Sequence, residues 1–172
     1  MPSKGVTDLK ISVVEYKDIT CDGNTSTKIH YVNGSPWHIT SEEVVNTLGS
    51  LYVGDGGDSD ETALDAFGCI LNTASMDWSA DAYKFVVLLT DATSKLDNNY
   101  SIPDFAFVSN KLADSHVYTS VITSTMYFDF YKILSEKTDG VMADIYGDYG
   151  TILSNFADNI VKISVDDADD RN

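Results

Sequence analysis

The second half of the sequence alternates between short apolar runs and amphipathic segments, and this alternation limits the fold more than any other feature. Three runs have the length and composition of strands: KFVVLLT (84–90), VYTSVIT (117–123) and GVMADIY (140–146). Three segments with helical periodicity alternate with them: 103–113, 126–137 and about 150–161. Strands that alternate with helices predict a doubly wound α/β fold, with a mainly parallel sheet and helices on both faces.

The first half is predicted to add two strands and two helices. The run KISVVEY (10–16) is almost continuously apolar and β-branched, as in a strand buried on both faces, and KIHYV (28–32) is expected beside it as an antiparallel edge strand. Thr40 and Glu43 have the spacing of a capping box, so a short helix should follow, and a largely buried helix is expected over 60–74. We therefore expect one sheet of about five strands, in which 10–16 and 84–90 are both buried.

Composition narrows the function classes. The 172 residues suit one domain, assigned to 1–165, followed by a short acidic tail at 166–172. The net charge of −16 argues against nucleic-acid binding, which requires Lys and Arg against phosphate. No apolar run has membrane-spanning length, and the first residues lack the apolar core of a signal peptide. Cys21 and Cys69 are interpreted as two separate thiols.

Four acidic residues lie where binding sites form in such sheets, outside the carboxyl ends of the strands. Asp91 follows one predicted strand and Asp18 another, while Asp58 and Glu61 precede a predicted helix. Carboxylate oxygens are hard ligands that Ca²⁺ and Mg²⁺ prefer, so a divalent-cation site is one interpretation. The other is that Asp58 and Glu61 form a helix capping box and that Asp91 and Asp18 lie in ordinary turns.

The order of KISVVEYKD, GGDSDETALDAF and W-x5-KFVVLLTDA resembles von Willebrand factor A domains, and most of all the I-like domain of integrin β subunits. The matching positions are Asp58-Ser59-Asp60-Glu61, Trp78 and Thr90-Asp91-Ala92. The later helices and strands follow in the same order, so the resemblance covers nearly the whole chain. It implies a Rossmann-like sheet.

The resemblance also implies a metal-ion-dependent adhesion site, where the ligand protein supplies an acidic side chain to a bound Mg²⁺. By position, Asp91 would be the adhesion-site aspartate. Glu61 would face both that metal and a neighbouring Ca²⁺ site, to which Asp58 and Asp18 would belong. Gly56 stands where integrin β domains carry an Asn.

The sequence departs from the family at its N-terminus. The first central strand of the family, with its Asp-x-Ser-x-Ser loop, is absent from this sequence. The Mg²⁺ shell is therefore incomplete, and residual binding should be weak and favour Ca²⁺. The absent strand would lie between 10–16 and 84–90. Three outcomes stay open: the two strands pair directly, another chain fills the gap (a second copy by strand exchange included), or the chain is a fragment of a longer protein.

These observations favour a non-enzymatic protein-binding or adhesion module of the von Willebrand factor A type. Its partner would be a protein ligand, engaged through an acidic side chain at the metal site. The alternatives are a structural or assembly module with a decayed metal site, or a fragment of a larger surface protein. A metal-assisted hydrolase is disfavoured because no candidate base or nucleophile accompanies the acids.

Overall fold

The computed structural model describes residues 8–52, 54, 58–72 and 76–170. These fall into two compact units, each considered by itself. The sheet unit comprises 78–93 and 104–170. The hairpin unit comprises the described part of 8–77 together with 94–103.

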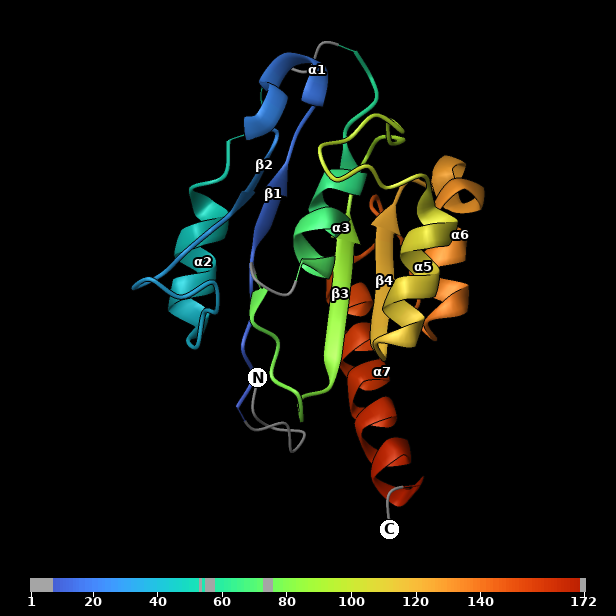
Figure 1. The fold of residues 1–172 in the computed structure, drawn as a ribbon. Coiled ribbons are helices and arrows are strands. Elements are labelled where there is room, and N and C mark those ends of the chain that lie inside the picture. Colours follow the sequence, from blue (N-terminus) through green and yellow to red (C-terminus); the bar gives the residue numbers. More distant parts are fainter. Residues whose placement is uncertain (1–7, 53, 55–57, 73–75, 171–172) are drawn as a thin grey trace. The chain divides into compact units, whose positions relative to one another are not determined.

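A three-stranded parallel sheet forms the centre of the sheet unit (Figure 1). Its strands, in the order in which they pair, are β3 (Lys84–Leu89), β4 (Val117–Thr123) and β5 (Met142–Asp144). Lys84 is in register with Val117, and Val121 with Met142. These are the three strands predicted from the apolar runs, and their parallel pairing is confirmed.

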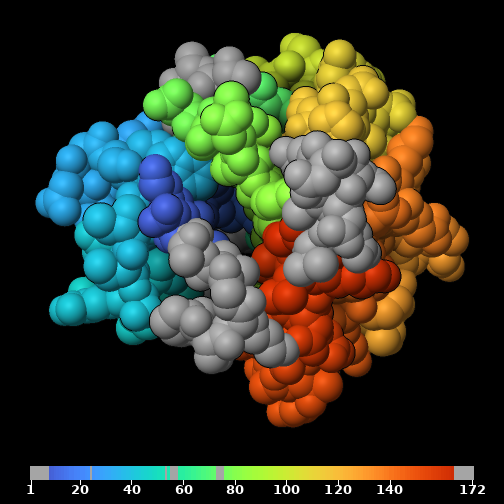
Figure 2. Space-filling view, turned by 90° about the horizontal axis from the view of Figure 1, so that it is seen from below, coloured from blue at the N-terminus to red at the C-terminus, as the bar shows by residue number. Residues whose placement is uncertain are grey.

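Helices flank this sheet. They are α5 (Phe105–Asp114), the 3₁₀ turn η2 (Thr125–Tyr127), α6 (Phe128–Lys137) and α7 (Tyr149–Asp170). The α5 and α6 helices contact β4 and share edge-to-face contacts among three aromatic rings, those of Phe105, Phe130 and Tyr131. Residues of α7 pack against Ile122 on the other face of β4, because neighbouring strand residues point to opposite faces. Figure 2 shows α7 (red) lying against the orange part of the chain.

Strand β3 is less buried than its sequence predicts. It lies at the edge of its sheet, and Val87 is 51% and Leu89 52% exposed, while Val86 and Leu88 are buried. Val87 and Leu89 are in register with Ser120 and Ile122, so they point to the same face of the sheet as Ile122, against which α7 packs. The expectation of a fully buried 84–90 strand is therefore wrong, since a parallel strand loses half its cover at an edge.

An antiparallel hairpin organises the other unit. β1 (Val14–Tyr16) pairs with β2 (Thr27–Ile29), with Glu15 opposite Lys28. The connection contains a short helix, α1 (Ile19–Asp22), and a 3₁₀ turn, η1 (Gly23–Thr25). The antiparallel pairing is confirmed. The burial predicted for 10–16 is wrong: β1 is three residues long and half-buried throughout, because in a two-stranded sheet every strand is an edge.

Two further helices belong to the hairpin unit, α2 (Ser41–Gly49) and α3 (Ala63–Leu71). The predicted capping box of α2 is confirmed: the Thr40 hydroxyl accepts from the Glu43 amide, and the Glu43 carboxylate accepts from the Thr40 amide. The α3 helix is almost entirely buried and packs on β1 and β2. It begins after Thr62, so the interpretation of Asp58 and Glu61 as its capping box is wrong.

The chain is thus a mixed α/β protein with a helix-flanked parallel sheet, compatible with a Rossmann-like fold. Its five strands do not form one sheet in the described residues: β1 and β3 belong to different sheets. The helix predicted over 103–113 is α5, which begins at Phe105 after the N-cap Asp104. The last helix, α7, runs to Asp170, beyond its predicted end. In the described part of the chain, no helix has both the length and the apolar character needed to cross a membrane.

Candidate cation site

Asp18 lies in the connection between β1 and β2 and is fully buried. It is the N-cap of α1, where its Oδ1 atom accepts hydrogen bonds from the Thr20 amide at 2.8 Å and the Thr20 hydroxyl at 2.7 Å. Asp, Ser, Thr and Asn are favoured at N-caps because a short side-chain acceptor reaches the first free amides. The sequence placed Asp18 correctly at a strand end, and the cap fixes the direction of its carboxylate.

The start of α3 is fastened to the same connection. The Thr62 hydroxyl accepts from the Ile19 amide at 3.0 Å, and the Thr62 amide donates to the Lys17 carbonyl at 3.2 Å. Four residues before Thr62, Asp58 accepts from the Asp60 amide at 2.9 Å through Oδ1, which leaves Oδ2 on its other side. The structure therefore brings the Asp58 and Asp18 loops together, as the sequence predicts.

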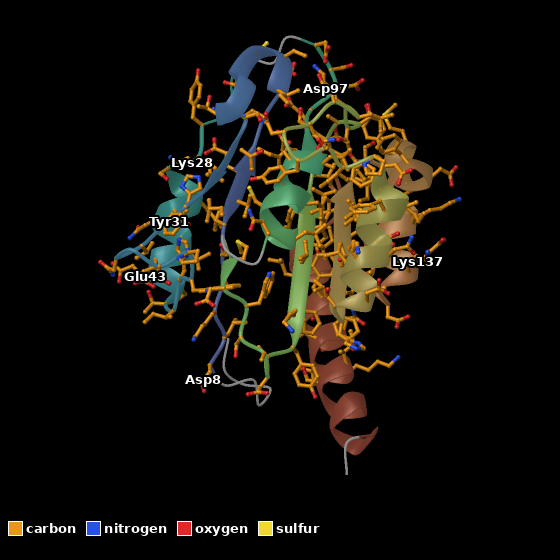
Figure 3. The ribbon with its side chains drawn as sticks, viewed as in Figure 1. Asp8, Lys28, Tyr31, Glu43, Asp97 and Lys137 are labelled. Carbon is orange, nitrogen blue, oxygen red and sulfur yellow. The ribbon has the colours of Figure 1, made fainter. Side chains whose placement is uncertain are left out.

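A third segment, 94–103, completes the cluster. Glu61 forms a parallel bridge with Ser94, and the Lys95 amide donates to the Glu61 carbonyl at 2.8 Å. Glu61 is half-buried, and its backbone carbonyl helps to position Lys95. Asp97, labelled in Figure 3, marks this segment two residues after Lys95.

The Lys95 ammonium lies among oxygen atoms from two of these segments. Its Nζ is 2.6 Å from Asp18 Oδ1, 3.1 Å from Asp58 Oδ2 and 3.1 Å from the Thr20 hydroxyl. The Lys95 side chain is only 13% exposed, whereas that of Asp58 is 58% exposed. One ammonium therefore joins a fully buried carboxylate to an exposed one.

These contacts change the pKa values of Asp58 and Lys95. The Asp60 amide, and after it the Lys95 ammonium, lowers the pKa of Asp58 below its ordinary value. Partial burial lowers the pKa of Lys95, but the hydrogen bonds to Asp18 and Asp58 outweigh this and raise it overall. Asp58 and Lys95 thus stay charged at neutral pH.

Asp91, the fourth predicted residue, belongs to the sheet unit and follows Thr90, the first residue after β3. It is exposed, and its turn is closed by hydrogen bonds between the Thr90 hydroxyl and the backbone of Ala92. The Ala92 carbonyl also accepts from the buried Tyr131 hydroxyl at 2.9 Å. These contacts hold Asp91 at the carboxyl end of its strand, as predicted.

No group of three or more His, Cys, Asp or Glu side chains is arranged to hold a metal ion within the residues that the structure describes. Gly56, where the resemblance expects an Asn, lies outside those residues. Of the predicted set, Asp18 and Asp58 meet at the Lys95 ammonium.

Sequence reasoning missed Lys95 itself. It lies in TDATSKLDNN (90–99), an acidic, Asn-rich stretch. The available signal was that Lys95 is the one basic residue in that stretch, in a chain with 11 Lys and Arg against 27 Asp and Glu. A lone base among acids is a candidate ion-pair partner, but its partner Asp18 is 77 residues away in sequence.

A second buried acid, Asp65, holds the 94–103 segment in place. The sequence analysis did not identify it as a functional or structural residue. Asp65 in α3 is fully buried, and its oxygens accept from the Ser26 hydroxyl at 2.8 Å, the Asn99 amide at 2.6 Å and the Asn99 side chain at 2.8 Å. Buried carboxylates need such donors because they lose hydration. Asp65 therefore anchors the 94–103 segment independently of Lys95.

Comparison of the sequence with models of known protein families and with curated proteins finds no match. The fold therefore defines only a broad structural class, that of mixed α/β proteins with a helix-flanked parallel sheet.

Proposed function

We propose that this chain is a non-enzymatic protein-binding module of the von Willebrand factor A type. Three features support the proposal: the parallel strand order of the sheet unit, the acidic residues placed after β1 and β3, and the order of sequence motifs described above. The absence of an enzymatic role is part of the proposal. It is supported by the contacts of Asp18 and Asp58, whose carboxylate oxygens both accept from the Lys95 ammonium and are thus engaged in an internal ion pair.

The observation that carries the binding role is the exposed apolar surface of β3. Parallel strands are ordinarily covered on both faces, yet Val87 and Leu89 are about half exposed. An edge strand with exposed apolar side chains is a template for an added strand, in which main-chain hydrogen bonds give affinity and side chains give specificity. We propose that a protein segment adds to β3.

A second copy of the chain is the partner that we commit to for this edge. The net charge of −16 opposes self-association in general, but the β3 segment KFVVLL contains one lysine and no acid. The strand itself therefore carries none of the excess negative charge. Isologous pairing or strand exchange through β3 would give a dimer.

The test is light scattering coupled to size-exclusion chromatography on the wild type and on Val87→Lys. We expect the mass of two chains for the wild type and of one chain for the variant, because a charge at the paired edge prevents strand addition. Leu153→Lys is the matched control: Leu153 is 48% exposed on α7 in the same unit, and its variant should keep the wild-type mass. A single-chain mass for the wild type, or an unchanged mass for Val87→Lys, contradicts association through β3.

The structural or assembly alternative, in which the fold persists and the cation site has decayed, is favoured by a different observation. The Lys95 ammonium lies between two of the carboxylates that a Ca²⁺ ion would use. Weak Ca²⁺ binding at Asp18, Asp58 and Glu61 stays a prediction, and so does the incompleteness of the Mg²⁺ site to which Asp91 would belong. The Lys95 ammonium weighs against the Ca²⁺ binding.

A further inference from the structure

We propose that the Lys95 ammonium is the resident cation of the hairpin unit, and that it fills a site which would otherwise accept a divalent cation. The inference concerns ion dependence and does not rest on the protein-binding role proposed above.

The hydrogen-bonding capacity of the ammonium matches its surroundings. A lysine ammonium carries three N–H donors and no acceptor, and three oxygens surround Nζ: Asp18 Oδ1, Asp58 Oδ2 and the Thr20 hydroxyl. Ca²⁺ requires six to eight oxygens at about 2.3–2.6 Å. The cluster thus satisfies a lysine with protein atoms alone, whereas a metal ion would need water or further ligands.

The oxygens of the cluster are held by contacts that do not involve the ammonium. Backbone hydrogen bonds join Thr62 to the 17–19 segment, and the Asp60 amide orients Asp58. The Lys95 backbone is held by Glu61, and Asp65 anchors Asn99 farther along the same segment. Removal of the ammonium should therefore leave the carboxylates close to their present positions.

Charge then decides which cation occupies the site. Without Lys95, two carboxylates, one of them fully buried, would lose the ammonium that now lies between them. A divalent cation would relieve the repulsion between them, and oxygen ligands suit Ca²⁺. With Lys95 present, Ca²⁺ would have to displace a like charge that occupies the same space.

The test compares thermal melts of the wild type and Lys95→Met, a variant that keeps the apolar stem and removes the charge. Each is melted in EDTA and in about 5 mM CaCl₂, above the 10⁻⁴–10⁻³ M dissociation range of weak Ca²⁺ sites, with KCl at equal ionic strength as the salt control. We expect no Ca²⁺ response from the wild type. Lys95→Met should melt lower than the wild type in EDTA and gain about 3–5 °C with Ca²⁺.

Two matched variants locate the effect. Lys132→Met removes an ammonium from an exposed pair with Asp129, and it should gain no Ca²⁺ response. Adding Asp58→Asn to Lys95→Met should abolish the Ca²⁺ gain. If Lys95→Met does not fold in EDTA, refolding in CaCl₂ gives the same decision: recovery supports the inference and failure to recover overturns it. A Ca²⁺ gain in the wild type that Asp58→Asn removes, or no gain in Lys95→Met, also overturns it.

Discussion

At the scale of single residues, buried polar groups in the hairpin unit are matched with donors from segments distant in sequence. Asp18 accepts from Lys95, and Asp65 accepts from Ser26 and Asn99. A sequence pattern identifies such acids as unusual only when they fall at a motif position, as Asp18 does. It cannot supply the partner, because the pairing depends on how three loops meet.

A buried thiol provides a test at this scale. Cys69 lies on α3, its sulfur 3.1 Å from the Tyr100 hydroxyl, and the neighbouring Gly68 leaves room for the Tyr100 ring. Desolvation raises the pKa of Cys69, partly offset by the Tyr100 hydrogen bond. Cys21 is exposed. The separate thiols predicted from the sequence are observed.

The prediction is that Cys69 reacts far more slowly than Cys21 with a disulfide reagent in the native protein, because the thiolate is the reactive form and its access is restricted. A raised pKa displaces the rate profile of Cys69 toward higher pH than that of an ordinary thiol, whose pKa is about 8.5. Absorbance kinetics on Cys21→Ser and Cys69→Ser from pH 7 to 9 measure each thiol alone. Urea should restore an ordinary profile to Cys69. Equal reaction rates for the two thiols in the native protein would contradict the burial of Cys69.

At the scale of elements, features that depend on residues close in sequence were predicted correctly. Features that depend on the packing of neighbouring elements were not. The Thr40–Glu43 capping box and the strands over 84–89 and 117–123 depend on residues close in sequence, and all are observed. The burial of β3 depends on which elements lie beside it, and composition alone cannot reveal an edge. The Asp58–Glu61 spacing suggested a cap, but the Thr62 hydroxyl bonds to Ile19 and α3 begins after it.

The connection between α6 and β5 gives an element-scale prediction. A methyl group at Gly140 would overlap the Thr119 carbonyl of β4, whereas one at Gly150, in the first turn of α7, meets nothing nearer than 3.6 Å. Gly140→Ala should therefore destabilise the protein by about 1–3 kcal/mol, as overpacked sites do. Gly150→Ala should be neutral or slightly stabilising, because alanine favours helix over glycine. Urea unfolding of both variants measures the difference in stability. Equal unfolding midpoints would contradict the close contact between Gly140 and the Thr119 carbonyl of β4.

At the scale of the whole molecule, acidic residues far outnumber basic ones, so each partly buried ammonium matters for reducing repulsion between carboxylates. With a net charge of −16, the chain places one of its few bases between two carboxylates and so reduces their mutual repulsion without a metal. The sequence indicated an acidic cluster and a divalent cation as its counter-ion. The structure shows an ammonium among the described residues of that cluster, and this is the basis for the central claim that the hairpin unit carries its own cation.

The most direct measurement of that claim is a ¹H–¹⁵N correlation spectrum of the lysine ammonium groups, recorded on labelled protein with and without Ca²⁺. Exposed ammonium protons exchange rapidly with water, whereas three hydrogen bonds and partial burial should protect those of Lys95. We predict a protected ammonium signal that disappears in Lys95→Met and does not move when CaCl₂ is added. A wild-type spectrum without that signal, or one in which Ca²⁺ shifts or removes it, would show that Lys95 does not hold the site and would contradict the account.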